Sequence, residues 1–193
     1  MSPTTSPPLA EKERPPVESE GEGCSGEQRD QTSSNRRRQA SEPDFIVVCD
    51  GGAKPNPGII AWAAIVQDAL GYRRMLSGVV ERGTNNQAEL LAALHALESL
   101  PDGATVRVRT DSRYLRDGAS TWISLWLLRN WRTVSGAPVV NRELWERLIL
   151  ATQRLSVEWQ WVKGHAGDEL NEMVDAECAR LLREAFASGR LVA

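Results

Sequence analysis

The chain has 193 residues and a mass of 21.3 kDa, and 41% of its residues are hydrophobic and 25% charged. These values are typical of one globular domain with or without a tail. No apolar run reaches the roughly 18 residues of a membrane-spanning helix, and we expect no secretory signal, because the N-terminus lacks an apolar core. The three cysteines are odd in number and lack zinc-site spacing. This excludes a disulfide framework and predicts a reduced, cytoplasmic setting.

Composition and charge divide the chain near residue 44. Residues 1–44 hold six Lys/Arg, nine Asp/Glu, six of the ten prolines and no aromatic residue. Such a segment cannot bury enough apolar surface to offset its ordering entropy, so we expect a disordered N-terminal tail. The rest of the chain has equal numbers of basic and acidic residues. Its net charge therefore does not by itself indicate a nucleic-acid partner.

The first elements expected after the tail are three strands. Runs of β-branched and apolar residues predict them at residues 45–49, 59–67 and 72–80. The first strand should end in a Gly-Gly turn after Asp50, and strong turn formers at 54–58 predict a loop before the second. A short turn at 68–71 should join the second and third strands as a hairpin.

A helix should follow the third strand, because Thr84 and Gln87 fit a capping box, and it should stop before Pro101. Strands and helices then alternate: a strand at 104–110, a helical segment at 114–132 broken near Gly118, a helix at 142–154, a strand at 157–161, a loop at 163–167 and a helix at 170–187. This pattern predicts one α/β domain over residues 45–188 with a mixed sheet, followed by a short tail at 189–193.

Four acidic residues lie where a ligand site could form. Asp50 and Asp111 each follow an apolar strand, Glu89 lies one turn inside a predicted helix, and Asp175 lies near the start of the last helix. Mg²⁺ prefers carboxylate and water oxygens, and two such ions can catalyse phosphodiester hydrolysis. Each acid could equally cap a turn or helix or lie on the surface. Spacing alone therefore leaves both interpretations open.

Several motifs occur together and in order along the chain. They are DGG and NPG at residues 50–52 and 56–58, TNNQAEL at 84–90, TDSRY at 110–114, the Trp-rich segment 122–131, WQWVKGHAG at 159–167, and Asn171, Glu172 and Asp175. In this combination the chain resembles type I ribonuclease H, and the resemblance covers residues 45–188. A single Asp-Gly-Gly would be weak evidence, but the joint occurrence is specific.

The resemblance implies a ribonuclease H-like α/β fold with helices packed on both faces of a mixed five-stranded sheet. It implies an endoribonuclease that hydrolyses the RNA strand of RNA–DNA hybrids with two Mg²⁺ ions, for which Mn²⁺ is a possible substitute. The products would carry 5′-phosphate and 3′-hydroxyl ends. At matching positions, the implied metal-binding carboxylates are Asp50, Glu89, Asp111 and Asp175. His165 would assist proton movement or product release.

The resemblance also implies a set of residues that bind the hybrid. Side-chain amides such as those of Asn85 and Asn86 can read the 2′-hydroxyls of a wide minor groove without regard to base sequence. The full implied set is Arg82, Thr84, Asn85, Asn86, Arg113, Trp126 and Asn141. Trp126 could instead pack in the core.

The chain departs from the family pattern after Trp126, where the expected lysines are Leu127 and Leu128. These leucines should either pack against the sheet or form an exposed apolar patch. Two other functions remain possible on this fold: a catalytically inactive hybrid-binding protein, or a nuclease acting on another nucleic acid. Four clustered acids without a metal would repel one another, which favours the active enzyme. We expect a monomer with no membrane association and no small-molecule cofactor.

Overall fold

The computed structural model describes residues 42–164 and 167–188. The predicted tails at 1–44 and 189–193 lie almost wholly outside these residues, so both stay predictions. Asp44, the last residue of the predicted N-terminal tail, is described. Its carboxylate accepts hydrogen bonds from the backbone N–H and the hydroxyl of Thr105, both at 2.8 Å. No helix in the described part of the chain is long and apolar enough to cross a membrane.

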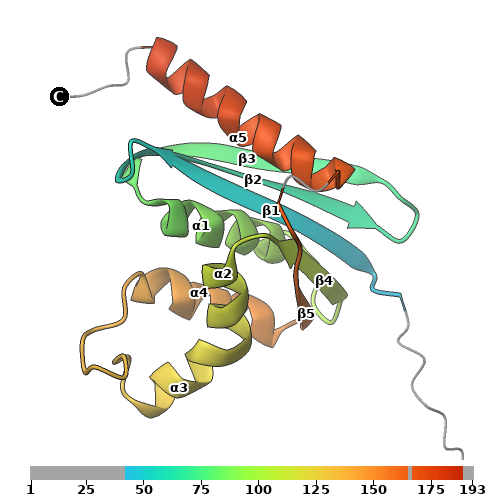
Figure 1. The fold of residues 1–193 in the computed structure, drawn as a ribbon. Coiled ribbons are helices and arrows are strands. Elements are labelled where there is room, and N and C mark those ends of the chain that lie inside the picture. Colours follow the sequence, from blue (N-terminus) through green and yellow to red (C-terminus); the bar gives the residue numbers. More distant parts are fainter. Residues whose placement is uncertain (1–41, 165–166, 189–193) are drawn as a thin grey trace, which may run out of the picture. The chain divides into compact units, whose positions relative to one another are not determined.

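Five strands form one mixed sheet in the order β3-β2-β1-β4-β5 (Figure 1). Antiparallel pairing joins β1 to β2 and β2 to β3, whereas β1, β4 and β5 are parallel neighbours. The expected mixed five-stranded sheet is thereby confirmed. The strand bounds are β1 Phe45–Lys54, β2 Gly58–Asp68, β3 Arg73–Gly83, β4 Thr105–Thr110 and β5 Ser156–Trp161.

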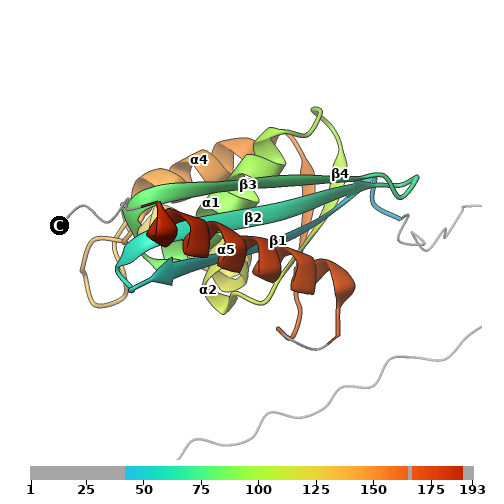
Figure 2. The same cartoon turned by 90° about the horizontal axis from the view of Figure 1, so that it is seen from above.

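Helices cover both faces of the sheet, as expected. Helix α5 (Glu169–Ala187) lies on one face and runs along β1 and β2 (Figure 2), and the other described helices lie on the opposite face (Figure 1). There α1 (Asn85–Glu98) packs between the sheet and α4 (Arg142–Gln153). Two short helices, α2 (Arg113–Asp117) and α3 (Ile123–Leu128), complete this layer with a π-helical turn, η1 (Gly118–Trp122), between them.

The apolar side chains form two cores, one on each face of the sheet. The larger core lies between the sheet and helices α1 and α4, around the fully buried Leu94 and Trp145. The smaller core lies under α5, around Val174. Because successive residues of a strand point to opposite faces, Val47 and Val48 of β1 enter different cores. Both faces of β1 are therefore fixed against a helix.

Strand β1 is longer than predicted. The Gly-Gly pair after Asp50 does not end it, because the strand stays paired with β2 from Gly51↔Trp62 to Lys54↔Ile59. The turn formers at 55–57 end it instead. A glycine pair predicts a turn only where no neighbouring strand supplies backbone hydrogen-bond partners. The local sequence does not show whether such a strand is present.

Two local predictions at helix ends are confirmed. Thr84 caps α1 in a capping box, in which its hydroxyl accepts from the Gln87 N–H and its own N–H donates to the Gln87 side chain. The break at Gly118 is present as the start of η1. A Cβ on Gly118 would clash with the buried ring of Trp145, so only glycine allows this close approach.

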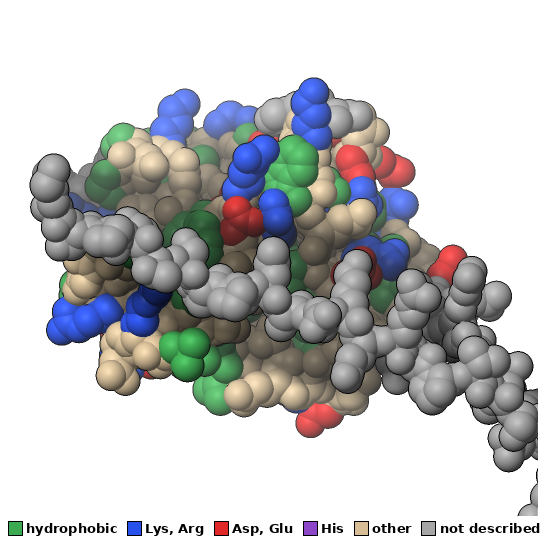
Figure 3. Space-filling view, turned by 60° about the horizontal axis from the view of Figure 1, so that its bottom comes forward, with side chains coloured by type: hydrophobic (Ala, Val, Ile, Leu, Met, Phe, Trp, Pro, Cys, Tyr) green, Lys and Arg blue, Asp and Glu red, His purple; other side chains and the backbone are tan. Residues whose placement is uncertain are grey.

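The leucines that replace the expected lysines are exposed. Leu127 is 51% and Leu128 83% exposed at the end of α3. They therefore form the exposed apolar patch and do not pack against the sheet. In the space-filling view of this side, Lys and Arg side chains occur in separate places with apolar side chains between them (Figure 3). This face has no single block of basic side chains among the residues coloured there.

The Tyr114 hydroxyl joins the start of α2 to the start of α4. It accepts hydrogen bonds from the indole N–H of Trp145 at 3.1 Å and from the side-chain amide of Asn141 at 3.2 Å. The Tyr114 ring also packs against the rings of Trp122 and Trp145. The hydroxyl therefore gives the indole N–H of buried Trp145 a hydrogen-bond partner inside an otherwise apolar cluster.

Replacing Tyr114 with Phe should lower the free energy of unfolding by about 1–3 kcal/mol, because the indole N–H of buried Trp145 loses its partner. Urea unfolding measures the change. Tyr72→Phe is the control, since Tyr72 is 73% exposed and its hydroxyl should matter by less than about 0.5 kcal/mol. Equal losses in the two variants would contradict the joining role.

Candidate active site

Asp50 and Asp111 meet where two parallel strands separate. The last registered pair between β1 and β4 is Val48↔Arg109, and each aspartate lies two residues beyond its member of that pair. Strand β4 ends at Thr110, while β1 continues beside β2. The carboxyl ends of parallel strands are the usual place for ligand sites in such sheets, and both aspartates lie there.

Glu89 reaches the same place from α1. The Thr84 cap sets where the helix begins, which puts Glu89 just after its first turn. The helix lies directly on β1, because a Cβ on Gly51 would clash with the backbone at Ala88 and Glu89. Glu89 is 9% exposed and therefore enters the site from the core side.

Asp50, Glu89 and Asp111 form a carboxylate triad. One carboxylate oxygen from each lies within 4.8 Å of those of the other two. The pKa of Glu89 is raised well above its ordinary value, first by burial and then by the charges of Asp50 and Asp111. Its Oε2 is buried and has no hydrogen-bond partner among the described residues. Three converging acids and an unsatisfied buried oxygen fit a divalent cation.

Asp175 lies on α5, outside this group of three. One turn further on, the Cys178 thiol donates to the backbone carbonyl of Asp50 at 3.5 Å. The pKa of Cys178 is raised by burial first, and then by the charges of Asp50, Glu89 and Asp175. Asp175 is therefore carried by the helix that packs on Asp50. It is not one of the three acids whose oxygens all lie within 4.8 Å of one another.

His165 lies outside the described residues, so its proposed role stays a prediction. Its neighbour Gly164 is described, and a Cβ there would clash with the Asp111 carboxylate. The segment after β5 therefore passes directly against the triad. A larger residue at this position would have to displace the Asp111 carboxylate.

The start of α1 holds part of the expected hybrid-binding set. The Asn85 side-chain oxygen accepts from the Ala53 N–H at 2.6 Å, and the Asn85 N–H donates to the Asn56 side chain at 3.3 Å. Asn85 thus ties the end of β1 to the start of α1. Arg82 and Asn86, on either side of the cap, are exposed.

The other expected hybrid-binding residues lie on α2, α3 and α4. The Arg113 guanidinium lies 5.1 Å from the centre of the Trp161 ring. Trp126 is half-buried among other tryptophan rings, so its packing role is observed and its contact with a hybrid stays a prediction. Asn141 caps α4 with a left-handed backbone (φ 61°) and donates to the Tyr114 hydroxyl.

Trp161 is a functional candidate that the sequence analysis missed. No role was expected for it within the motif at 159–167, and it is 38% exposed. Its indole N–H donates to the backbone carbonyl of Asp111 at 2.9 Å. The contact follows from the parallel register Thr110↔Trp161. The sequence carries no sign of that register until β4 and β5 are known to be neighbours.

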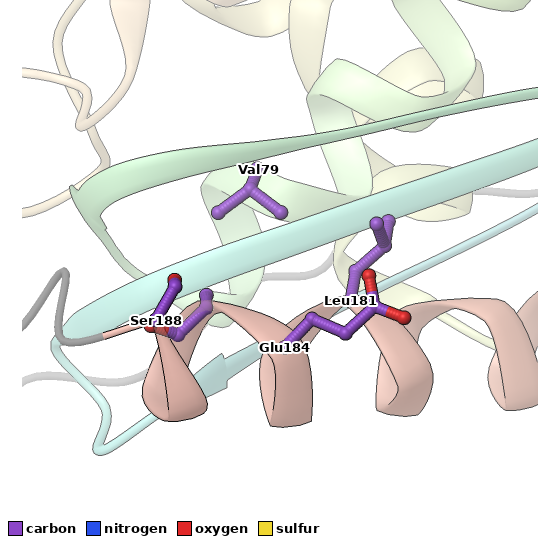
Figure 4. Close-up of a pocket in the computed structure, with 5 residues that line it drawn as sticks. Val79, Leu181, Glu184 and Ser188 are labelled. Carbon is purple, nitrogen blue, oxygen red and sulfur yellow. The ribbon is translucent and has the colours of Figure 1, made fainter.

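One pocket contains no residue of this site. It lies between β3 and the C-terminal part of α5 (Figure 4), and Val79, Leu181, Glu184, Ala185 and Ser188 line it. No member of the carboxylate triad contributes to its wall.

Two aspartates where neighbouring parallel strands separate and a glutamate from the helix packed on them, in a five-stranded sheet of this order, define a metal-dependent nuclease of the ribonuclease H-like class. The RNase H family model matches residues 42–182. The chain therefore belongs to the RNase H family, and its activity is the family's, the hydrolysis of the RNA strand of RNA–DNA hybrids.

Individual relatives agree with this assignment. The ribonuclease H of Acidiphilium cryptum is 48% identical over 149 residues, which cover 76% of this chain and 92% of the relative. That of Xanthomonas campestris is 49% identical over 126 residues, covering 65% and 83%. Among solved structures, LC9-RNase H1, a type 1 RNase H with the type 2 active-site motif, is 29% identical with a TM-score of 0.63 over 72% of this chain and 71% of that one. LC11-RNase H1, solved with an RNA/DNA hybrid, is 21% identical with a TM-score of 0.52 over 72% and 99%, and shows the likeness of fold.

Proposed function

We propose that the chain cleaves hybrid RNA with two divalent ions, Mg²⁺ or Mn²⁺, and leaves 5′-phosphate and 3′-hydroxyl ends. The observation that carries the proposal is the triad around the unpartnered Oε2 of Glu89. Burial and then the charges of Asp50 and Asp111 raise the pKa of Glu89, and both disfavour the ionised cluster unless a cation is bound. The ligands in this proposal are Asp50, Glu89, Asp111 and Asp175.

The protein's own contribution is to hold these ligands in place. Bound ions would supply an activated water and neutralise charge at the scissile phosphate. Burial in the core fixes Glu89, and the Trp161 indole holds the backbone of Asp111 at 2.9 Å. Helix α5, fastened to Asp50 through Cys178, would bring Asp175 to the open side of the triad. His165 would move a proton or aid product release.

We propose that the hybrid lies across the starts of α1, α2 and α4. The amides of Asn85 and Asn86 suit the 2′-hydroxyl-lined minor groove of the hybrid, and Arg113 lies beside the triad next to Trp161. Arg82, Thr84 and Asn141 would hold a phosphate of the DNA strand, and Trp126 would lie beside its sugars. The monomeric state and the cytoplasmic location stay predictions from the sequence.

One cleavage experiment tests this function. A labelled RNA strand is presented as RNA–DNA hybrid, as duplex RNA and as a single strand, each with Mg²⁺ and with EDTA. We expect cleavage of the hybrid alone, only with Mg²⁺, and products with 5′-phosphate ends. Hybrid binding without cleavage would establish the inactive binding protein instead. Efficient cutting of duplex RNA would establish a nuclease for another substrate.

A further inference from the structure

An ion pair fastens the start of α5 to the neighbouring sheet. The Arg109 guanidinium on β4 contacts the Asp168 carboxylate. Asp168 is also the N-cap of α5, because its other oxygen accepts from the N–H groups of Leu170 at 3.1 Å and Asn171 at 3.2 Å. One carboxylate therefore both begins the helix and ties it to a strand.

The pair lies between two elements of the active site. Arg109 lies on β4 two residues before Asp111, which directly follows the strand, and Asp168 precedes Asp175 by seven residues, about two helical turns. The two side chains are only 24% and 23% exposed, so water and salt screen the pair less than a surface pair. Burial raises the pKa of Asp168, but hydrogen bonds from Asn171 and the charge of Arg109 lower it below its ordinary value. Asp168 is therefore ionised at neutral pH.

A second ion pair at the same end of α5 provides a natural comparison. Arg73 of β3 contacts Glu169 at 2.8 Å, with side chains 41% and 72% exposed. Strand β3 is the edge strand on the far side of β2 from the triad. Both pairs join an arginine on a strand to a carboxylate at the start of α5. They differ in burial and in whether an acid of the triad directly follows their strand.

We propose that the Arg109–Asp168 pair is a positioning device, which fixes the start of α5 against β4 and so sets how closely Asp175 approaches the carboxylate triad. Neither residue belongs to the triad, and both act through Asp175. The inference rests on the proposed function, because it takes Asp175 to be a metal ligand.

Helix geometry shows why this pair controls Asp175. Further along, α5 is held by Cys178 on the Asp50 carbonyl. At 1.5 Å rise per residue, Asp168 lies about 15 Å before Cys178 and Asp175 about 4.5 Å before it. If the helix pivots at Cys178, a shift of about 1.5 Å at Asp168 moves Asp175 by about 0.5 Å. That is the tolerance within which functional groups have to be held.

The variant Asp168→Asn separates the two roles of Asp168, because Asn caps a helix as well as Asp but cannot form the ion pair. Arg109→Gln removes the other partner, and Arg109→Lys keeps its charge. Calorimetry with Mn²⁺ alone measures metal affinity without substrate, and cleavage at varied Mg²⁺ gives the half-saturating concentration and the KM for hybrid. We expect about tenfold weaker metal binding in Asp168→Asn and Arg109→Gln, in the range for residues that orient metal ligands. Arg109→Lys should keep most of the wild-type metal affinity. The KM for hybrid should be unchanged in all three variants.

The controls separate positioning from general helix anchoring. Arg73→Gln should leave Mn²⁺ affinity at the wild-type value. In the double variant Asp168→Asn/Asp175→Asn, the affinity should equal that of Asp175→Asn alone, because the pair acts through Asp175. Equal weakening in Arg73→Gln and Asp168→Asn would overturn the inference.

Two outcomes distinguish this inference from the proposed function. If Asp175→Asn binds Mn²⁺ as tightly as the wild type, Asp175 is not a ligand and that part of the proposed function fails. If Asp175→Asn binds Mn²⁺ weakly while Asp168→Asn and Arg109→Gln bind it normally, the proposed function stands and the positioning role fails.

Discussion

Replacing Asp111 with Asn should abolish hybrid cleavage and leave the protein folded. The substitution removes one of the three carboxylates that converge within 4.8 Å. Metal ions contribute several kcal/mol of charge stabilisation to such reactions. Since each 1.36 kcal/mol is tenfold in rate, we expect a loss of about a thousandfold or more. Initial rates on the labelled hybrid in Mg²⁺ measure it, and a fully active variant would contradict the metal-site assignment.

The stability of the same variant without metal should change in the opposite direction from its activity. The Asp111 charge helps to raise the pKa of Glu89, so its removal relieves repulsion. The melting temperature in EDTA should therefore be unchanged or higher. The control Asp102→Asn alters an acid that is 81% exposed and paired with Arg154 at the surface, so activity should be kept. An inactive Asp111→Asn protein that melts far below the wild type would indicate misfolding instead.

The raised pKa of Glu89 also sets a pH dependence. The folded protein holds this proton more tightly than the unfolded chain, in which the pKa is near 4.5. The free energy of unfolding of the metal-free protein therefore falls as the pH rises from about 4.5 through the raised pKa. In Asp111→Asn this fall should be smaller, because one source of the shift is absent. Melting curves in EDTA across this pH range check the sign.

Local sequence signals were sufficient for most of the fold. The capping box at Thr84 and the glycine break at Gly118 depend on neighbours within one helical turn, and both are present. The strands also follow their apolar patterns, apart from their ends. The prediction ended β1 near Asp50, but the strand continues to Lys54. Its last residues are held by pairing with β2, and such pairing cannot be read from the local sequence. Two consecutive glycines at this point are compatible either with a turn or with a paired strand.

The acidic triad could be predicted from motifs, but the groups that hold it could not. Trp161 and Asp111 are fifty residues apart, and their contact follows from the pairing of β4 with β5. The sequence contains one weak indication for Arg109. It is a charged residue near the end of a short strand, next to the inward-facing Val108, and such a charge needs a partner. That the partner is the N-cap of α5 depends on which helix covers that face, a property of the whole fold.

Replacing Gly51 with Ala should damage both stability and activity, although it adds only one methyl group. The new Cβ would clash with the backbone of α1 at Ala88 and Glu89, and a helix backbone cannot rotate aside as a side chain can. Overpacking of this kind costs about 1–3 kcal/mol. Since a shift of about 1 Å in a catalytic group can cost a hundredfold in rate, displacement of Glu89 should lower cleavage by up to about that factor.

Gly52→Ala is the matched control for this effect. It adds the same methyl group one residue later on the same strand, where the Cβ would meet only the Leu182 side chain at an ordinary 3.7 Å. Urea unfolding and hybrid cleavage should therefore distinguish the two variants clearly, with Gly52→Ala close to the wild type. If the two behave alike, the close approach of α1 to β1 does not position Glu89. If only Gly51→Ala is impaired, the absence of one Cβ on β1 is what allows the core helix to deliver a carboxylate to the metal site.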